Sequence, residues 1–397
     1  MIPLLILIFL TFISLGLPDA VLGAAWPAMR ADFGLPYGYA GVIAAITCAA
    51  TVASSLLSAR LVAWLGVGRL VFVSTLLTAA ALVLYAYTSS LYWLLVVTIP
   101  LGFGGGAIDA AVNNYVSTHY RAGHLNLLHA FWGVGAMTGP LIIAHQLAPE
   151  PFWTIPLLAA RGWQQGYLIL GGVQFAIAVL LLLHLKSWRR PASSSDPVNK
   201  ETAVLSNRQA LRQKGVMTQM IACFSYCALE IGTGLWLSSF LVVGYGLPAS
   251  VAAFWVAMFY FGITGGRFLC GVISDRIQGT VLGRGGLALV GCGVGLTLIA
   301  HDVSFVQIGV VLIGLGCAPI FPAILHQTPK RFGAAASQTV MGLSMASAYL
   351  SVTITPLLIG LIATQHSIVI LPQLLLVFGL SILFHTEKLN KMAGVAA

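Results

Sequence analysis

Charged side chains are scarce in this sequence. Only 7% of its 397 residues are Asp, Glu, Lys or Arg, whereas 59% are hydrophobic, and the mean hydropathy is +0.95. This scarcity excludes an ordinary soluble domain and a disordered chain, because both need far more charge to remain in water. Short segments of strict polar–apolar alternation are also lacking, which argues against a transmembrane barrel. The sequence consists instead of apolar runs long enough to cross a bilayer as helices.

Cysteine is infrequent, and its placement excludes two further classes of site. All six cysteines lie within apolar runs, where cysteine acts as a small packing residue. We therefore expect neither disulfides nor a metal site.

The apolar runs and the residues that break them predict twelve transmembrane helices, so we expect an all-α membrane protein. The opening run lacks the basic start of a signal peptide and is followed by more of the same pattern, which favours a first span. The predicted spans are 3–28, 37–63, 67–88, 91–118, 124–146, 163–186, 215–243, 249–274, 281–300, 303–326, 335–363 and 366–385.

A polar segment divides these spans into two groups of six. Residues 187–214 are rich in Ser, Pro and charge, as expected of a linker, and a short surface helix is expected near 207–213. We therefore expect an N-terminal six-helix bundle at 1–186 and a C-terminal six-helix bundle at 215–397.

The two groups also resemble each other in sequence. "GLP" occurs at 34–36 and at 246–248, and the same offset superposes "LGFGGGAI" from Leu101 on "IGLGCAPI" from Ile313. Two parallel repeats of this kind are typical of secondary transporters.

The basic residues lie mostly in alternate loops. They cluster around the linker and recur in every second loop, whereas the opposite loops hold only Arg30 and Arg161. By the positive-inside rule, both termini and the linker are expected in the cytoplasm of a multi-pass protein of the inner membrane. The net charge of +9 follows from this topology and does not indicate a nucleic-acid partner.

Three acidic residues lie deep inside predicted spans: Asp19, Asp109 and Glu230. A lone charge at such depth costs about 2.5–3.5 kcal/mol. We expect no basic residue at matching depth, with Arg267 the nearest. Such carboxyls must be protonated, face a hydrated cavity or bind a cation. The alternative for each is a static hydrogen bond to a neighbouring helix, and the "GLPD" that contains Asp19 could also be a local kink.

Neutral polar residues gather near Asp109. Asn113 follows four residues later on the same helix face, and the next span carries Asn126, His129 and Trp132 on one stripe. Amide and imidazole groups bind hydroxyls without adding a buried charge, and an indole offers its face to the apolar side of a sugar ring. The alternative is plain packing or, for the tryptophan, an interface anchor.

The seventh and tenth spans carry the features of interest in the second half. Tyr226 and Glu230 share a helix face, and Trp236 projects about 120° away from it. Pro319 and Pro322 are expected to interrupt the tenth span and free backbone carbonyls. Phe321 occupies the repeat position of Asp109, so ion chemistry is expected in one half.

These segments are similar to those of a known family. "DAAVNN", "LNLLHAFWGVGA", "LGCAPIFPAIL" and the first-span acid resemble the fucose–galactose–glucose:proton symporter branch of the major facilitator superfamily, and the resemblance covers all twelve spans. The cytoplasmic signature of the superfamily is present once, as "GVISDRI", and its first-half counterpart lacks the acid. The resemblance implies that Asp109 carries a proton and that Asp19 contributes to sugar recognition. This chain has aspartate where the pattern has glutamate, and His129 where an amide is expected, so the sugar is not identified.

We therefore expect three groups of functional residues. The coupling site is expected at Asp109, Glu230 and Asp19. The solute site is expected at Asp19, Asn113, Asn126, His129, Trp132, Tyr226, Glu230 and Trp236. The conformational gate is expected at Gly271, Asp275, Arg276 and Arg267.

The leading hypothesis is a symporter rather than an enzyme. A sugar or sugar-like solute binds between the halves, and neutralisation of a carboxyl permits the loaded carrier to change conformation. We expect no cofactor beyond H⁺ as coupling ion, with Na⁺ as the alternative, and a monomer whose partners are a small solute and the bilayer. A proton-driven exporter is the second hypothesis, because "GVGAMTGP" partly matches the signature of such antiporters. A transport-inactive sensor is disfavoured, because linker and tail offer no signalling domain.

Overall fold

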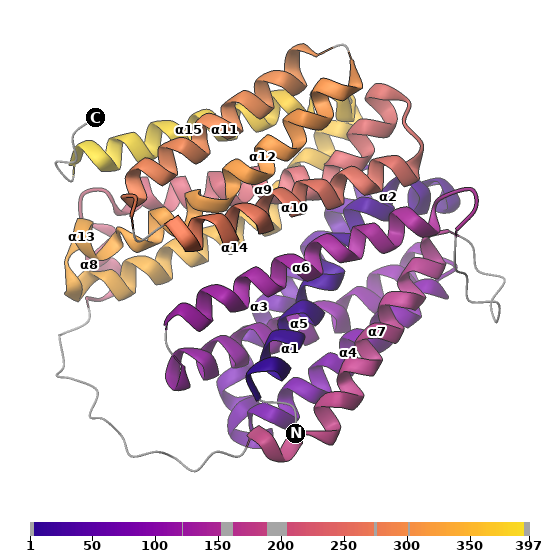
Figure 1. Cartoon of the computed structure of the whole chain (residues 1–397), viewed down its shortest axis with the longest axis horizontal. Helices are drawn as coiled ribbons and strands as arrows, with labels where there is room; N and C mark the ends of the chain where they lie inside the picture. The colour runs from indigo at the N-terminus through magenta and orange to yellow at the C-terminus, as the bar shows by residue number, and fades with distance from the viewer. Residues whose placement is uncertain are drawn as a thin grey trace. The chain divides into compact units, whose positions relative to one another are not determined.

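The computed structural model describes residues 4–120, 122–151, 162–188, 205–273, 276–300 and 302–392 (Figure 1). Over these ranges every regular element is helical, which confirms the predicted all-α class. The helices are α1 Leu4–Asp19, α2 Val21–Phe33, α3 Tyr39–Leu65, α4 Val67–Ala86, α5 Leu91–His119, α6 Ala122–Gln146, α7 Trp163–Leu183, η1 Leu185–Trp188, α8 Asn207–Leu211, α9 Val216–Tyr245, α10 Ala249–Ile273, α11 Gly279–Ile299, α12 Val303–His326, α13 Thr328–Phe332, α14 Ala334–Gln365, η2 Ile368–Ile370 and α15 Leu371–Met392.

The predicted number of spans is confirmed. Among the described residues, twelve helical stretches are long and apolar enough to cross a bilayer. Most predicted bounds agree with the structure within a few residues, as for Ala249–Ile273 against 249–274. The last span differs most, because α15 continues to Met392 through the polar sequence "HTEKLNK", which is rich in good helix formers.

The first span is broken after "GLPD", so the kink that was the alternative for this segment is present, without a side-chain cap at the start of α2. α1 ends at Asp19 and α2 begins at Val21. Pro18 has no N–H, so the carbonyl of Ser14 loses its usual helical partner. The side-chain amide of Gln174 in α7 donates to that carbonyl at 2.5 Å, and the Ser14 hydroxyl donates to Gln174 Oε1 at 2.6 Å. A buried amide on a neighbouring helix therefore compensates for the break.

The chain packs into two compact units that alternate along the sequence. Unit 1 comprises Met1–Arg190, Gly234–Phe261 and Pro356–Val369, and unit 2 comprises Pro191–Thr233, Gly262–Thr355 and Ile370–Ala397. Helices α9, α10 and α14 therefore contribute residues to both units. The predicted bundles at 1–186 and 215–397 are defined by sequence repetition rather than by compactness, and they stay a prediction.

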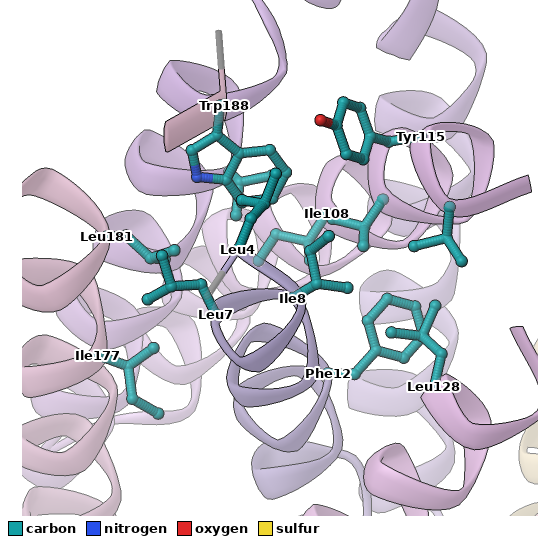
Figure 2. Close-up of a cluster of buried hydrophobic side chains, with 13 residues drawn as sticks. Leu4, Leu7, Ile8, Phe12, Ile108, Tyr115, Leu128, Ile177, Leu181 and Trp188 are labelled. Carbon is teal, nitrogen blue, oxygen red and sulfur yellow. The ribbon is translucent and has the colours of Figure 1, made fainter. Parts of the chain in front are cut away.

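Figure 2 shows the core of unit 1, in which α1 is surrounded by its neighbours. Leu4, Leu7, Ile8 and Phe12 lie on α1 and are buried against side chains of α4, α5, α6, α7 and η1. Lipid tails are as apolar as these side chains, so close packing rather than exclusion of water stabilises the cluster. The contributions from the surrounding helices are Val71, Ile108, Val112, Tyr115, Val116, Leu128, Ile177, Leu181 and Trp188.

Small residues bring α1 and α6 together. A Cβ at Gly16 would collide with the carbonyl oxygen of Trp132, and a Cβ at Gly135 with that of Ile13. Because glycine has no side chain at these crossings, the two backbones approach closely, as small residues allow in membrane helices. This approach fixes Trp132 opposite the end of α1.

A second set of close backbone contacts lies elsewhere in unit 1. A Cβ at Gly23 would collide with the carbonyl oxygen of Gly234, and a Cβ at Gly41 with that of Pro356. The N–H of Gly38 donates to the Thr364 hydroxyl at 3.0 Å beside the same contacts. We call this set the glycine seam.

In unit 2, α11 packs against α12 and α15. Glycines again meet backbone where α11 crosses α12, at Gly286 with Gly316 and at Gly293 with Gly309. On the other side, Arg284 of α11 forms a bidentate ion pair with Glu387 of α15, with both N–O distances 2.8 Å. A fork of this kind fixes the register of the two helices.

The short helix expected near 207–213 is confirmed as α8. Ser206 and Gln209 form a capping box at its start, which satisfies the first free N–H groups. Its Ala210 is fully buried against Ala336 and Val340, so the helix is docked onto unit 2.

The prediction that prolines interrupt the tenth span is wrong. α12 runs unbroken from Val303 to His326, with Pro319 and Pro322 inside it. Each proline removes one backbone hydrogen bond, but neighbouring helices support the segment in a membrane protein. The carbonyl of Leu315, which Pro319 leaves without its usual donor, faces the close approach of Gly266.

Candidate functional site

Asp19 lies in the middle of the first span, where the break between α1 and α2 ends the helix at its carboxyl group. Its Oδ2 accepts the indole N–H of Trp132 at 2.6 Å, and the side chain is solvent-exposed. The carboxyl is therefore hydrogen-bonded on one oxygen and accessible to a solute on the other. The α1–α6 glycine contacts position this pair, whose members lie 113 residues apart in sequence.

Asp109 lies in α5, close enough to Asp19 for the two carboxyl groups to interact electrostatically. The amide of Asn113, one turn later, donates to Asp109 Oδ1 at 2.8 Å, as their spacing of four predicted. The other end of that amide, Asn113 Oδ1, is buried and has no hydrogen-bond partner in the structure. An unpaired buried acceptor is costly, so this oxygen is suited to a donor or cation that arrives from outside.

Two aromatic contacts complete this part of unit 1. His129 is exposed and stands edge-on to Phe12, with ring centroids 5.8 Å apart. Tyr260 of α10 stands edge-on to Trp132 at 6.4 Å, and its hydroxyl lies beside Gly234. Tyr260 was not among the predicted site residues. The sequence feature that could have indicated Tyr260 is the aromatic run 259–261, but such a run is also typical of a helix face that contacts lipid.

Glu230 has a basic partner, contrary to the expectation that no such residue lies at its depth. In unit 2, Arg267 Nη2 lies 3.9 Å from Glu230 Oε1, and both side chains are about one-fifth exposed. Tyr226 is near enough to interact electrostatically with both. Side chains point toward the N-terminus of their own helix, so residues on the antiparallel α9 and α10 reach toward each other. The position of a residue along its helix does not include this reach.

The remaining predicted residues are placed differently. Trp236 is fully buried in unit 1, and a Cβ at Gly360 would lie 3.1 Å from its ring, close to the glycine seam. Gly271 lies near the end of α10, and Arg276 follows in the turn before α11. Asp275 and the side chain of Asn126 lie outside the described residues.

The unit 1 cluster offers oxygens and rings rather than a metal site. Within the described ranges, no group of three or more His, Cys, Asp and Glu side chains is placed to hold a metal ion. The carboxyl of Asp109 can bind a proton, and its oxygens together with Asn113 Oδ1 are hard ligands that can coordinate an alkali cation. Asp19, Trp132 and His129 add an acceptor, an aromatic face and an imidazole for a polar solute.

The model of the family described as the Major Facilitator Superfamily matches residues 4–356. The chain belongs to this superfamily. The members of the superfamily that are similar to this chain are transporters and not enzymes. Transporters of this superfamily lie in a lipid bilayer and bind small-molecule solutes.

Two curated relatives are transporters of small polar solutes. A probable sulfoacetate transporter, SauU of Cupriavidus necator, is 24% identical over 70% of this chain and 67% of its own length. The glucose/mannose transporter GlcP of Bacillus subtilis is 24% identical over 62% of this chain. The match spans 59% of that relative's length.

Solved structures agree with the fold. A bacterial homolog of the human lysosomal transporter Spinster, in an inward-facing and unoccupied conformation, superposes with a TM-score of 0.74 at 14% identity, over 98% of this chain and 96% of that chain. A mutant of the nucleoside transporter NupG gives 0.70 at 14% identity, over 97% and 98%. At this identity the likeness concerns the fold alone.

Proposed function

We propose that this transporter is a proton-coupled symporter of a neutral, hydroxyl-rich solute such as a sugar. The observation that carries the proposal is the contrast among the three acids within the spans: Asp19 and Asp109 are held by neutral donors, whereas Glu230 faces a guanidinium. A carboxyl beside an amide or indole can gain and lose a proton without leaving a buried charge unpaired.

Asp109 is the proposed proton carrier. Its hydrogen bond comes from Asn113, which supports the carboxylate without supplying a charge of its own. The nearby Asp19 carboxyl adds repulsion when both are ionised, so loading a proton on one of them relieves the other. In the described residues the ion pairs involve Glu230 and Glu387, which leaves Asp109 as the better proton site.

Asp19, Trp132 and His129 are the proposed solute contacts. A sugar has hydroxyl donors for the accessible oxygen of Asp19 and an apolar ring face for the indole. An anionic solute would face the negative charge of Asp19 and Asp109 at this site. The substrate of GlcP is consistent with this selectivity, and the substrate of SauU serves as an anionic test compound.

The finer assignment follows the sequence resemblance. We infer membership of the fucose–galactose–glucose:proton symporter branch and an inner-membrane location with both termini in the cytoplasm. The working transporter is inferred to be a monomer in which the bundles at 1–186 and 215–397 alternate access to the site, with a gate at Gly271, Asp275 and Arg276.

The test is uptake by the purified protein in proteoliposomes. A pH gradient, acidic outside, is imposed in sodium-free buffer, and radiolabelled glucose, mannose, fucose, galactose and sulfoacetate are compared. We expect uphill accumulation of at least one neutral sugar, its collapse on adding a protonophore, and no accumulation of sulfoacetate.

Three outcomes contradict the proposal. Accumulation that requires sodium and ignores the pH gradient identifies the sodium symporter. Movement of solute against the direction of the proton gradient identifies the exporter. Accumulation of sulfoacetate without any sugar overturns the assignment of a neutral solute.

A further inference from the structure

The exposed face of α15 changes from apolar to basic toward the end of the helix. Leu380, Leu383 and Phe384 are 55%, 44% and 63% exposed. Lys388 and Lys391 follow and are exposed too. These positions are three or four residues apart and therefore lie along one face, which we call the α15 stripe.

A third lysine joins the stripe from a distant part of the sequence. Lys214 lines the same hollow, of about 900 Å³, as the lysines and apolar residues of the α15 stripe. The next residue, Gly215, has a φ of +99°, and a Cβ there would lie 2.9 Å from the terminal carbon of Met392. Glycine therefore permits both the turn and the close approach that hold Lys214 beside the end of α15.

One acid faces the three lysines of this hollow and does not balance them. Among the lining residues the acid is Glu387, and both of its oxygens accept from Arg284 at 2.8 Å. Lys391 also lies near enough to interact with Glu387, so the single negative charge is shared between an arginine and a lysine. In the part of the chain that the structure describes, the two ion pairs are made by Arg267 and Arg284. The three lysines are thus available to an anion from outside the protein.

We propose that the α15 stripe with Lys214 binds one anionic phospholipid. The three ammonium groups surround the lipid phosphate, and the acyl chains lie along Leu380, Leu383 and Phe384. Lysines grouped at the end of a membrane helix attract anionic headgroups, and their aliphatic stems tolerate the apolar surface below. The continuity of basic and apolar surface favours a lipid over free phosphate, which would use the basic part alone. The site uses none of the residues assigned to solute or ion.

The test is native mass spectrometry of the full-length protein in detergent, titrated with phosphatidylglycerol or phosphatidylcholine. The variant Lys214→Gln/Lys388→Gln/Lys391→Gln is compared with the control Arg60→Gln/Arg69→Gln/Lys186→Gln, which removes the same charge from exposed sites of unit 1. We expect the wild type and the control to bind one phosphatidylglycerol preferentially, and the lysine variant to bind it on the order of thirtyfold more weakly. Phosphatidylcholine binding should not differ among the three.

Several results would overturn the proposal. One is equal phosphatidylglycerol affinity in the lysine variant and the control. A second is inorganic phosphate competing with the lipid at equal concentration, which would indicate a simple anion site. A third is a dimer of the wild type that the lysine variant loses, which would make the stripe an interface between copies. Because all three lysines are exposed, the thermal stability of the triple variant without added lipid should equal that of the control. Each single lysine variant should bind phosphatidylglycerol about threefold more weakly than the wild type.

Discussion

The acids that lie within the spans have different kinds of partner in unit 1 and in unit 2. Asp19 and Asp109 accept from an indole and an amide, whereas Glu230 faces the guanidinium of Arg267. A neutral donor keeps no net charge when its carboxyl partner is protonated, whereas a guanidinium is left as an unpaired charge when its partner becomes neutral. A position deep in a span therefore does not by itself identify a coupling residue, because the chemical nature of the partner also matters.

The strongest test of this contrast is Asp109→Asn. The amide cannot exchange a proton, so uphill accumulation should fall to the level of equilibration, while exchange of labelled for unlabelled solute should persist. Proteoliposome uptake and counterflow measure the two quantities.

A control with the same chemical change is Asp302→Asn. Asp302 caps α12 outside the span by accepting from the Ser304 N–H at 2.7 Å, and asparagine caps equally well. This variant should transport like the wild type. Loss of exchange with coupling intact in Asp109→Asn would contradict the assigned role.

The second test addresses unit 2 through Glu230→Gln. The change leaves the guanidinium of Arg267 without its anion, and both side chains are only 17–20% exposed. We expect a loss of about 1–3 kcal/mol of stability, below that of a fully buried pair because the N–O distance is long. Thermal unfolding should show this loss, and Arg267→Gln in the same chain should restore most of it.

Solute accumulation in the stabilised double variant decides the comparison. We expect accumulation to continue, because the proton is carried by Asp109. A double variant that unfolds like the wild type but no longer accumulates solute would make Glu230 a second coupling residue.

The third test is Trp132→Phe, which keeps an aromatic ring and removes the donor to Asp19. A hydrogen bond to a charged group contributes about 1.5–3 kcal/mol, so solute affinity should weaken by at least about tenfold. Isothermal titration with the best transported sugar measures this. Unchanged affinity would show that the indole N–H does not shape the solute site.

The smallest expected effect is that of His129→Ala. The imidazole is exposed and is placed by packing on Phe12, so it contributes one hydrogen bond at most in our proposal. We expect about threefold weaker affinity and unchanged coupling. If affinity for every transported solute is unchanged, the solute does not contact this face of α6.

Local features could be predicted from the sequence, and contacts between distant helices could not. The twelve spans, the short helix α8 and the Asp109–Asn113 pair follow from hydropathy, capping and a spacing of four. The Asp19–Trp132 bond depends on which glycines let α1 and α6 approach, which no spacing along the chain encodes.

The error over Arg267 has a similar origin. The depth of Arg267 along the helix axis differs from that of Glu230, but each side chain extends toward the N-terminus of its own helix, and the two helices are antiparallel. Pro319 also shows the limit of local rules, because a proline that would end an isolated helix is accommodated in a helix held by its neighbours.

The glycine seam has a consequence for how readily the helices that it joins can move apart. Where Gly23 meets Gly234 and Gly41 meets Pro356, bare main chain touches bare main chain. Beside these crossings, the Thr364 hydroxyl accepts from the Gly38 N–H and the Ser238 hydroxyl donates to the Ala24 carbonyl. The crossings themselves place no side chain that has to change rotamer when the backbones separate. A methyl group added at Gly23 or at Gly41 would collide with the facing carbonyl oxygen. A single carbon atom is therefore enough to hold these helices farther apart and to change the preferred conformation of this part of the molecule.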